Sequence, residues 1–136
     1  MPDTLLLQVV SPDRQLVEEQ VTDVQVPALD GFIGVLPGHA KLLSMLKPGG
    51  LLSYHVGGQE KSLVVYGGFV EVLPDRVRVL ADSAEFREEI NSQEAKRQLD
   101  DAMNALQSPP GAAIDPAVAI DEMFRAQARV EAAEKK

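Results

Sequence analysis

The sequence predicts a β + α fold, in which an antiparallel β-sandwich or barrel precedes an antiparallel two-helix hairpin. Up to about residue 84, short apolar stretches are separated by Asp-Gly, Gly-Gly and Pro-Asp turn signals, which is typical of an all-β domain. From about residue 91, apolar residues recur every three or four positions, as they do in amphipathic helices. We therefore expect a β-sandwich domain at 1–86 and a helical hairpin at 87–136.

The strands are expected in the apolar stretches of the first part. Val77 and Val79 alternate with arginines, so one face of the last strand should be buried. Paired glycines predict a hairpin at 57–58 and a break between strands at 67–68, because glycine tolerates positive φ. No segment of helical length lies between the stretches, which argues against a parallel α/β sheet. The expected strands are 5–10, 21–29, 32–36, 51–56, 61–66, 69–73 and 76–82.

Two helices are expected in the second part, each with a recognisable start. Asn91 followed by Glu94 fits an N-terminal cap. Asp115 followed by Pro116 supplies a second cap with proline at the first helical position. The segment 108–116 contains three prolines and a glycine and should separate the helices. The expected apolar stripes are Leu99, Ala102, Met103 and Leu106 in the first helix, and Ile120, Met123, Phe124 and Val130 in the second, where Gln127 interrupts the face.

These stripes are thin, so the two helices should bury little area against each other. We expect the hairpin to be weakly stable alone and to lean on the β domain, on a ligand or on another chain. Weakly held elements are the ones that change conformation, so this marginal stability is itself a functional indication.

Composition excludes several classes of function. The chain has 136 residues, a net charge of −8 and no cysteine, which leaves no disulfide or thiolate chemistry. A negative field of this size repels nucleic acid and anionic membrane surfaces. We therefore expect no nucleic-acid partner. No apolar run approaches membrane-spanning length, so we expect no bilayer insertion. The N-terminus has neither a basic start nor a small-residue cleavage site, so we expect no signal peptide.

No catalytic or metal site is predicted. The glycine-rich stretch around Gly34, Gly38 and Lys41 does not match the spacing of a phosphate-binding P-loop. His39 and His55 are the two histidines, and they lack both a nucleophilic serine motif and a zinc-binding spacing. His39 is interpreted as a packed or hydrogen-bonded structural residue, and His55 as a surface residue.

The arrangement of motifs resembles one known family. The carrying segments are VVSPDR at 9–14, GFIGVLPGHAKLL at 31–43, GGFVEV at 67–72 and VLADSAE at 79–85. In this order and spacing they resemble the epsilon subunit of bacterial and chloroplast F-type ATP synthases, equivalent to the mitochondrial delta subunit. The resemblance covers essentially the whole chain and implies a sandwich of about ten strands followed by two helices.

The resemblance also implies a role and partners. The chain would be a non-catalytic subunit of the central rotor stalk, coupling the c-ring to the gamma subunit during proton-driven ATP synthesis. It would lie peripherally at the cytoplasmic face of a bacterial plasma membrane, or at the stromal face of a thylakoid. Many relatives carry a charged residue where this chain has Phe32, so an exposed Phe32 would replace a polar contact with an apolar one. The residues expected to face gamma and the c-ring are Asp30, Gly31, Phe32, Pro37, Gly38 and His39.

For the hairpin, the resemblance implies a regulatory role. In the family it can lie beside the sandwich or extend along gamma into the alpha/beta catalytic head, where it blocks ATP hydrolysis. Some relatives bind ATP on the folded hairpin through an I/L-D-x-x-R-A motif and arginines of the second helix. The matching segment here, 90–95, has Asn91 and Glu94 at the two charged positions of that motif, although Arg125 and Arg129 match the second-helix arginines. We therefore expect weak or absent ATP binding and no other cofactor.

Two readings of Arg125 and Arg129 remain open. They lie four residues apart on one helix face, so they could be a surface pair balanced by Glu122 or a contact for an anion or a partner. The alternative to a rotor subunit is an independent ATP-sensing module, which a ligand would stabilise without any partner. A hydrolase is disfavoured because no nucleophile and base are paired in the sequence.

Overall fold

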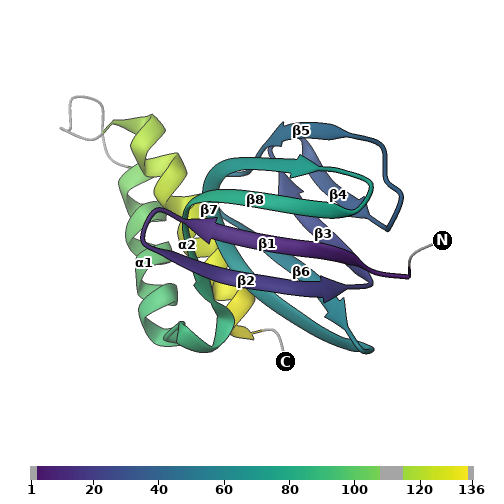
Figure 1. Ribbon diagram of the computed structural model, residues 1–136. Helices are drawn as coiled ribbons and strands as arrows, with labels where there is room; N and C mark the ends of the chain where they lie inside the picture. The colour runs from purple at the N-terminus through teal and green to yellow at the C-terminus, as the bar shows by residue number, and fades with distance from the viewer. Residues whose placement is uncertain (1–2, 108–114, 135–136) are drawn as a thin grey trace.

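The computed structural model describes residues 3–107 and 115–134, which form a β-sandwich flanked by two antiparallel helices (Figure 1). The expected fold class is confirmed, with the strands complete before the helices begin. The expected break at 108–114 lies outside the described residues. In chain order the elements are β1 (Leu5–Ser11), β2 (Arg14–Val21), β3 (Asp23–Ala28), β4 (Gly31–Val35), β5 (Leu42–Met45), β6 (Gly50–Val56), β7 (Gln59–Val72), β8 (Arg76–Phe86), the short 3-10 turn η1 (Arg87–Glu89), α1 (Ser92–Leu106) and α2 (Pro116–Glu134).

One long strand, β7, links the two layers of the sandwich. The strands follow the order β2-β1-β8-β7-β6-β3-β4, and β5 pairs with β7 outside this path. The first half of β7 pairs with β6, its second half pairs with β5, and β8 follows it along both halves. A single strand therefore contributes to both layers, its first half beside β6 and its second half beside β5.

The expected break at Gly67 and Gly68 is a bend inside β7. Both residues have positive φ, 69° and 112°, yet pairing with β8 continues from Tyr66 to Gly68. The prediction of separate strands at 61–66 and 69–73 was therefore wrong, because a left-handed glycine turns a strand without ending its hydrogen bonds. The described residues contain eight strands, fewer than the ten or so that the resemblance implied.

Two strands, β2 and β5, had no counterpart among the expected apolar stretches. In β2 only Val17 and Val21 are buried, and no residue of β5 is buried. Both lie at sheet edges, each paired with one neighbour, so their sequences carry little of the apolar alternation that marks an inner strand.

One pair of strands runs parallel, which departs from the expected antiparallel arrangement. β1 pairs with β8 in parallel register, so that Leu7 lies beside Val77 and Val9 beside Val79. All four side chains are fully buried. The first and last strands of the sandwich are therefore joined at its centre, and these four side chains belong to the core together with Val70 and Val72 of β7.

The helix starts are as expected, but the apolar stripes are not. Asn91 Oδ1 accepts a hydrogen bond from the Glu94 amide at 3.0 Å, and Asp115 Oδ1 accepts one from Ala117 at 2.9 Å. The predicted packing of Met103, Leu106, Ile120 and Phe124 was wrong, since all four are at least 37% exposed. Of the expected stripe residues, Ala102 is confirmed as buried. The other buried helix residues are also alanines: Ala95, Ala119, Ala126, Ala128 and Ala132.

Alanine at the seams lets the helix axes approach closely, which large side chains would prevent. Ala128 and Ala132 pack on Val64 and Tyr66 of β7, and α1 and α2 also contact each other. The expectation that the hairpin leans on the β domain is confirmed, because α2 contacts β6 and β7.

We predict that Gly68→Ala destabilises the sandwich. A Cβ at this position would lie 2.1 Å from the Leu80 carbonyl oxygen, and the φ of 112° is unfavourable for any L-residue. We expect a loss of about 2 kcal/mol or more in the free energy of unfolding, measured by urea denaturation.

The matched control is Gly34→Ala, because no atom lies within 4 Å of the Cβ that it would add. It should change stability by no more than about 0.5 kcal/mol. Equal effects of the two substitutions would contradict the assigned role of the bend.

Candidate functional site

Large apolar side chains are exposed in a row across three strands. Met45 of β5 lies beside Phe69 of β7, which lies beside Leu80 of β8, and the Leu29 amide donates a hydrogen bond to the Met45 carbonyl at 2.9 Å. These side chains are 48–53% exposed. Leu43, two residues before Met45 on the same face of β5, is 70% exposed. We call Leu29, Leu43, Met45, Phe69 and Leu80 the apolar face.

The apolar face consists of several exposed apolar residues, which backbone pairing between neighbouring segments places side by side. A monomeric protein rarely leaves such a patch in water unless a partner covers it. Phe32 and Leu36, 61% and 63% exposed, extend exposed apolar surface onto β4 and the loop after it. This region is therefore the strongest candidate for a protein interface.

The residues expected from the sequence to face partners lie at and after the β3–β4 turn. Asp30 is exposed in the turn, and Gly31 begins β4 with a φ of 135°. Phe32 is exposed, and its ring lies 5.5 Å from the Lys47 ammonium. An apolar residue with a cation over its ring is suited to contacting another protein surface.

The other three lie in the loop before β5. The Gly38 amide donates to the Pro74 carbonyl at 2.8 Å, which fixes the loop against the β7–β8 turn. His39 is half-buried, and its Nδ1 lies 2.6 Å from the Ala40 carbonyl. Pro37 is likewise half-buried, so Gly38 is the most exposed of the three.

Sequence reasoning missed the apolar face itself. Phe69 and Leu80 alternate with buried residues, so they occupy the outward positions of their strands, where polar side chains are usual. The signal in the sequence is an apolar residue at a strand position where the alternation with buried residues predicts a polar one.

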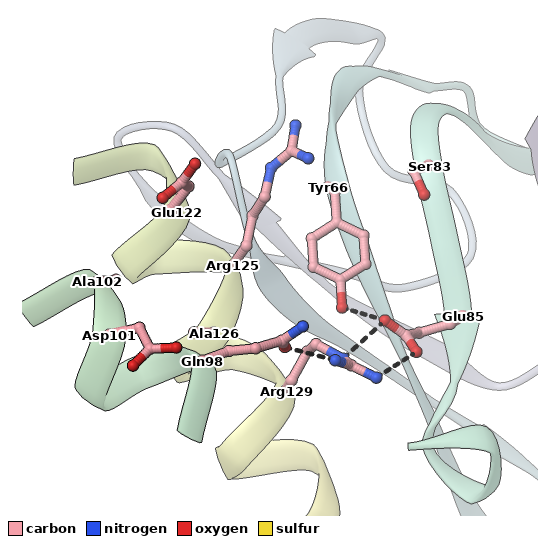
Figure 2. Close-up of a pocket in the computed structure, with 10 residues that line it drawn as sticks. All are labelled: Tyr66, Ser83, Glu85, Gln98, Asp101, Ala102, Glu122, Arg125, Ala126 and Arg129. Atoms are coloured by element: carbon pink, nitrogen blue, oxygen red, sulfur yellow. Dashed lines mark hydrogen bonds and ion pairs between the residues drawn. The ribbon is translucent and has the colours of Figure 1, made fainter. Parts of the chain in front are cut away.

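A second candidate site lies between the hairpin and the sheet (Figure 2). It is a pocket of about 490 Å³, within the range of small-molecule sites. Its walls come from β7, β8 and both helices. The lining residues are Tyr66, Ser83, Glu85, Gln98, Asp101, Ala102, Glu122, Arg125, Ala126 and Arg129.

Arg129 is the centre of the polar contacts in this pocket. Its Nε lies 3.1 Å from a carboxylate oxygen of Glu85 on β8, and its Nη1 donates to Gln98 of α1 at 2.5 Å. Glu94 of α1 is 3.8 Å away. The Tyr66 hydroxyl donates to Glu85 as well, so one carboxylate joins β7, β8 and α2 (Figure 2).

Arg125 lies one turn earlier on α2 and is more exposed. Its guanidinium lies 5.7 Å from the centre of the Tyr66 ring, in a cation–π arrangement. The two arginines expected to share a helix face both lie on the pocket side of α2, but their contacts differ: Arg129 points to the Glu85 carboxylate, whereas Arg125 lies over the Tyr66 ring and points away from Glu85 (Figure 2).

The charges of the pocket do not favour a phosphate-rich ligand. Three carboxylates, on Glu85, Asp101 and Glu122, line it together with two guanidinium groups. Glu94, which stands at a charged position of the nucleotide motif, adds a fourth carboxylate near Arg129. An incoming anion would have to displace Glu85 from Arg129 and approach the remaining carboxylates, which costs electrostatic free energy.

The histidines do not form a catalytic group. His55 lies in a cross-strand row between Asp23, at 2.8 Å from its Nδ1, and Glu60, at 3.7 Å from its Nε2. The nitrogen that would activate a serine therefore faces a carboxylate. Over residues 3–107 and 115–134, no cluster of histidine and carboxylate side chains could hold a metal ion, and no helix is both long and apolar enough to cross a membrane.

Comparison with known proteins gives a consistent result. Residues 4–87 match the family described as ATP synthase, Delta/Epsilon chain, beta-sandwich domain. The chain is 53% identical to the ATP synthase epsilon chain of Solibacter usitatus, over the full length of both. It is 40% identical to that of Dehalococcoides mccartyi, covering 97% of this chain and 94% of that one.

Among solved structures, similarity extends over the helices as well. A chain of the Euglena gracilis mitochondrial ATP synthase, in an assembly of OSCP, F1 and c-ring, has a TM-score of 0.84 at 27% identity. The match covers 99% of this chain and 84% of that one. A chain of the Tetrahymena thermophila central stalk and c-ring has a TM-score of 0.65 at 13% identity, covers 95% and 96% of the two chains, and supports the fold alone.

We predict that neither tyrosine of the native protein ionises near its ordinary pKa. Burial raises the pKa of Tyr54 to about 12, with Glu19 adding to the effect. Burial, then the hydrogen bond to Glu85, raises the pKa of Tyr66 further in the same direction. Because folding raises both values above the unfolded value of about 10, the stability they contribute is complete below pH 10 and is lost as pH rises beyond it.

The measurement is phenolate absorbance, which is clean because the chain has two tyrosines and no tryptophan. Absorbance should rise only together with loss of the native circular dichroism. Tyr54→Phe leaves Tyr66 as the single reporter. A tyrosine that titrates at about pH 10 while the fold stays intact would contradict the assignment.

Proposed function

This chain belongs to the ATP synthase epsilon chain family, and from that premise we propose that it is a non-catalytic subunit of the rotor stalk of an F-type ATP synthase. In this role it connects the ring of c subunits to gamma during proton-driven ATP synthesis. Support comes from the similar Euglena chain, whose assembly contains F1 and the c-ring. The non-catalytic role is supported by the packing of His55 between carboxylates and of Arg129 against Glu85.

The observation that carries this proposal is the apolar face. Four of its five residues and Phe32 expose large side chains on strands, and Leu29 does so in the turn between β3 and β4. Strands β4 and β5 lie on the side of the sandwich away from α1 (Figure 1). We propose that gamma and the c-ring cover this surface and the neighbouring residues Asp30, Gly31, Pro37, Gly38 and His39. Glycines and prolines here set the turns that present apolar side chains, and the partner is a protein.

We further propose that the helical hairpin, 87–136, is a mobile regulatory domain that restrains ATP hydrolysis by extending into the alpha/beta head. Its seam with the sheet uses alanines, which bury less area than large side chains and therefore hold the docked position weakly. Met103, Leu106, Ile120 and Phe124 stay exposed when the hairpin is docked, so they remain available for contacts in an extended position.

The alternative, an independent ATP sensor, has one supporting observation, the pocket that contains Arg125 and Arg129. The carboxylates around those arginines weigh against it, as described above. The rotor role is therefore favoured. It places the chain at the cytoplasmic face of a bacterial membrane, held there by its partners.

We predict that Met45→Ser combined with Phe69→Ser weakens binding to gamma by about tenfold or more, because both side chains leave water when a partner covers the apolar face. Binding would be measured by calorimetry with purified gamma. The control, Gln15→Ser with Gln20→Ser, changes two exposed residues of β2, the opposite edge strand. Equal affinities of the two double variants would contradict the proposed interface.

We predict that a chain ending at Ile90 raises the ATP hydrolysis rate of the assembled complex several-fold. This truncation removes both helices and keeps η1, which the ion pair between Arg14 and Glu89 at 2.8 Å fastens to the sandwich. Subunit content of the two complexes would be matched by gel analysis. An unchanged rate in fully assembled complexes would contradict the inhibitory role and leave the coupling role standing.

A further inference from the structure

One arginine of α2 contacts two other elements, β8 and α1. Arg129 of α2 forms an ion pair with Glu85 on β8. It also donates a hydrogen bond to Gln98 and lies within ion-pair distance of Glu94, both on α1. Its side chain is 15% exposed and that of Glu85 is 23% exposed, so the pair is shielded from water far more than the other ion pairs of the surface. Opening the hairpin would separate these charges, and closing it would restore all the contacts at once.

A second contact fixes where α2 sits. Gly49 precedes β6 and lies directly beneath the helix, since a Cβ there would approach the Arg125 Cα to 2.7 Å and the Phe124 carbonyl oxygen to 2.8 Å. Its φ is not in the left-handed region, so alanine suits the local backbone. Glycine is therefore needed at position 49 because α2 leaves no space for a Cβ, and not because of the local backbone conformation.

The ion pair also balances charge within the pocket, because both of its members line it. The carboxylate of Glu85 already occupies the guanidinium of Arg129, and the Tyr66 hydroxyl donates to that same carboxylate. Asp101 and Glu122 face the remaining space together with Arg125. In the docked state Glu85 therefore balances the charge of Arg129 without an anionic ligand, while the buried Nε of Arg129, 3.1 Å from the carboxylate, makes no hydrogen bond of good geometry.

We propose that the hairpin of this chain is held by a built-in latch, formed by Arg129 with Glu85, Gln98 and Glu94 and seated on Gly49, so that docking is independent of nucleotide. The inference deepens the proposed function of the hairpin, because the latch sets how readily the inhibitory element leaves the sandwich. Salt screens the ion pairs, so docking weakens as ionic strength rises.

The test is hydrogen exchange of backbone amides in the full chain, followed by mass spectrometry. Arg129→Gln and Gly49→Ala should each speed exchange in α1 and α2 by roughly tenfold, with β1 and β8 unchanged. The first variant has its control in Arg97→Gln, an exposed arginine of α1, and the second in Gly34→Ala. Adding millimolar ATP with magnesium should leave exchange of the wild-type helices unchanged.

Three results would overturn the latch. Exchange in α1 and α2 could be the same in Arg129→Gln and Arg97→Gln, it could be unaffected by Gly49→Ala, or ATP could slow it in the wild type. If Arg129→Gln also loosens the strands, Gly49→Ala carries the test, because it leaves every charge in place. Exchange is measured on the isolated chain, so a latch can be established even where truncation leaves hydrolysis by the complex unchanged, and the two proposals fail separately.

Discussion

The bend of β7 at Gly67 and Gly68 is the constraint on which the rest of the molecule depends. It lets one strand pair with β6 in one layer and with β5 in the other, while β8 follows both halves. The two layers are thus held together by continuous backbone as well as by side-chain packing. The same bend brings Phe69 beside Met45 and Leu80 on the outside and sets Val64 and Tyr66 under α2. The apolar face and the position of the hairpin on the sheet are both consequences of it.

The sandwich and the hairpin are stabilised by different physics. Fully buried valines and leucines from β1, β7 and β8 form a core in which removing a methyl group is costly. The hairpin has small side chains at its seams and an ion pair at its centre. Burial of apolar area holds the first part firmly, whereas the second depends on close approach and electrostatics, both of which a single substitution or added salt can alter. Two parts with different kinds of stabilisation are thereby combined in a short chain.

Local signals in the sequence were sufficient for the fold class and for most element boundaries. The caps at Asn91 and Asp115 and the hairpin at Gly57-Gly58 depend on neighbouring residues alone, and all are present. Features that depend on contacts between residues far apart in the sequence could not be predicted. Whether Gly67-Gly68 ends a strand or bends it is decided by β8, and whether a helix buries alanine or leucine is decided by how closely its neighbour approaches. The apolar face was missed for a related reason. Phe69 can be recognised as an exposed apolar residue only when it is known which face of its strand is turned to solvent.

The parallel pairing of β1 with β8 has a consequence for synthesis. Leu7 and Val9 must wait for Val77 and Val79, about seventy residues later in the chain, before the centre of the sandwich can close. A growing chain therefore has no complete core until the end of β8 has left the ribosome, and its early strands need protection until then. The hairpin leaves the ribosome after β8, when the strands on which α2 packs are already available. The order of the chain thus lets the sandwich form before the hairpin docks on it.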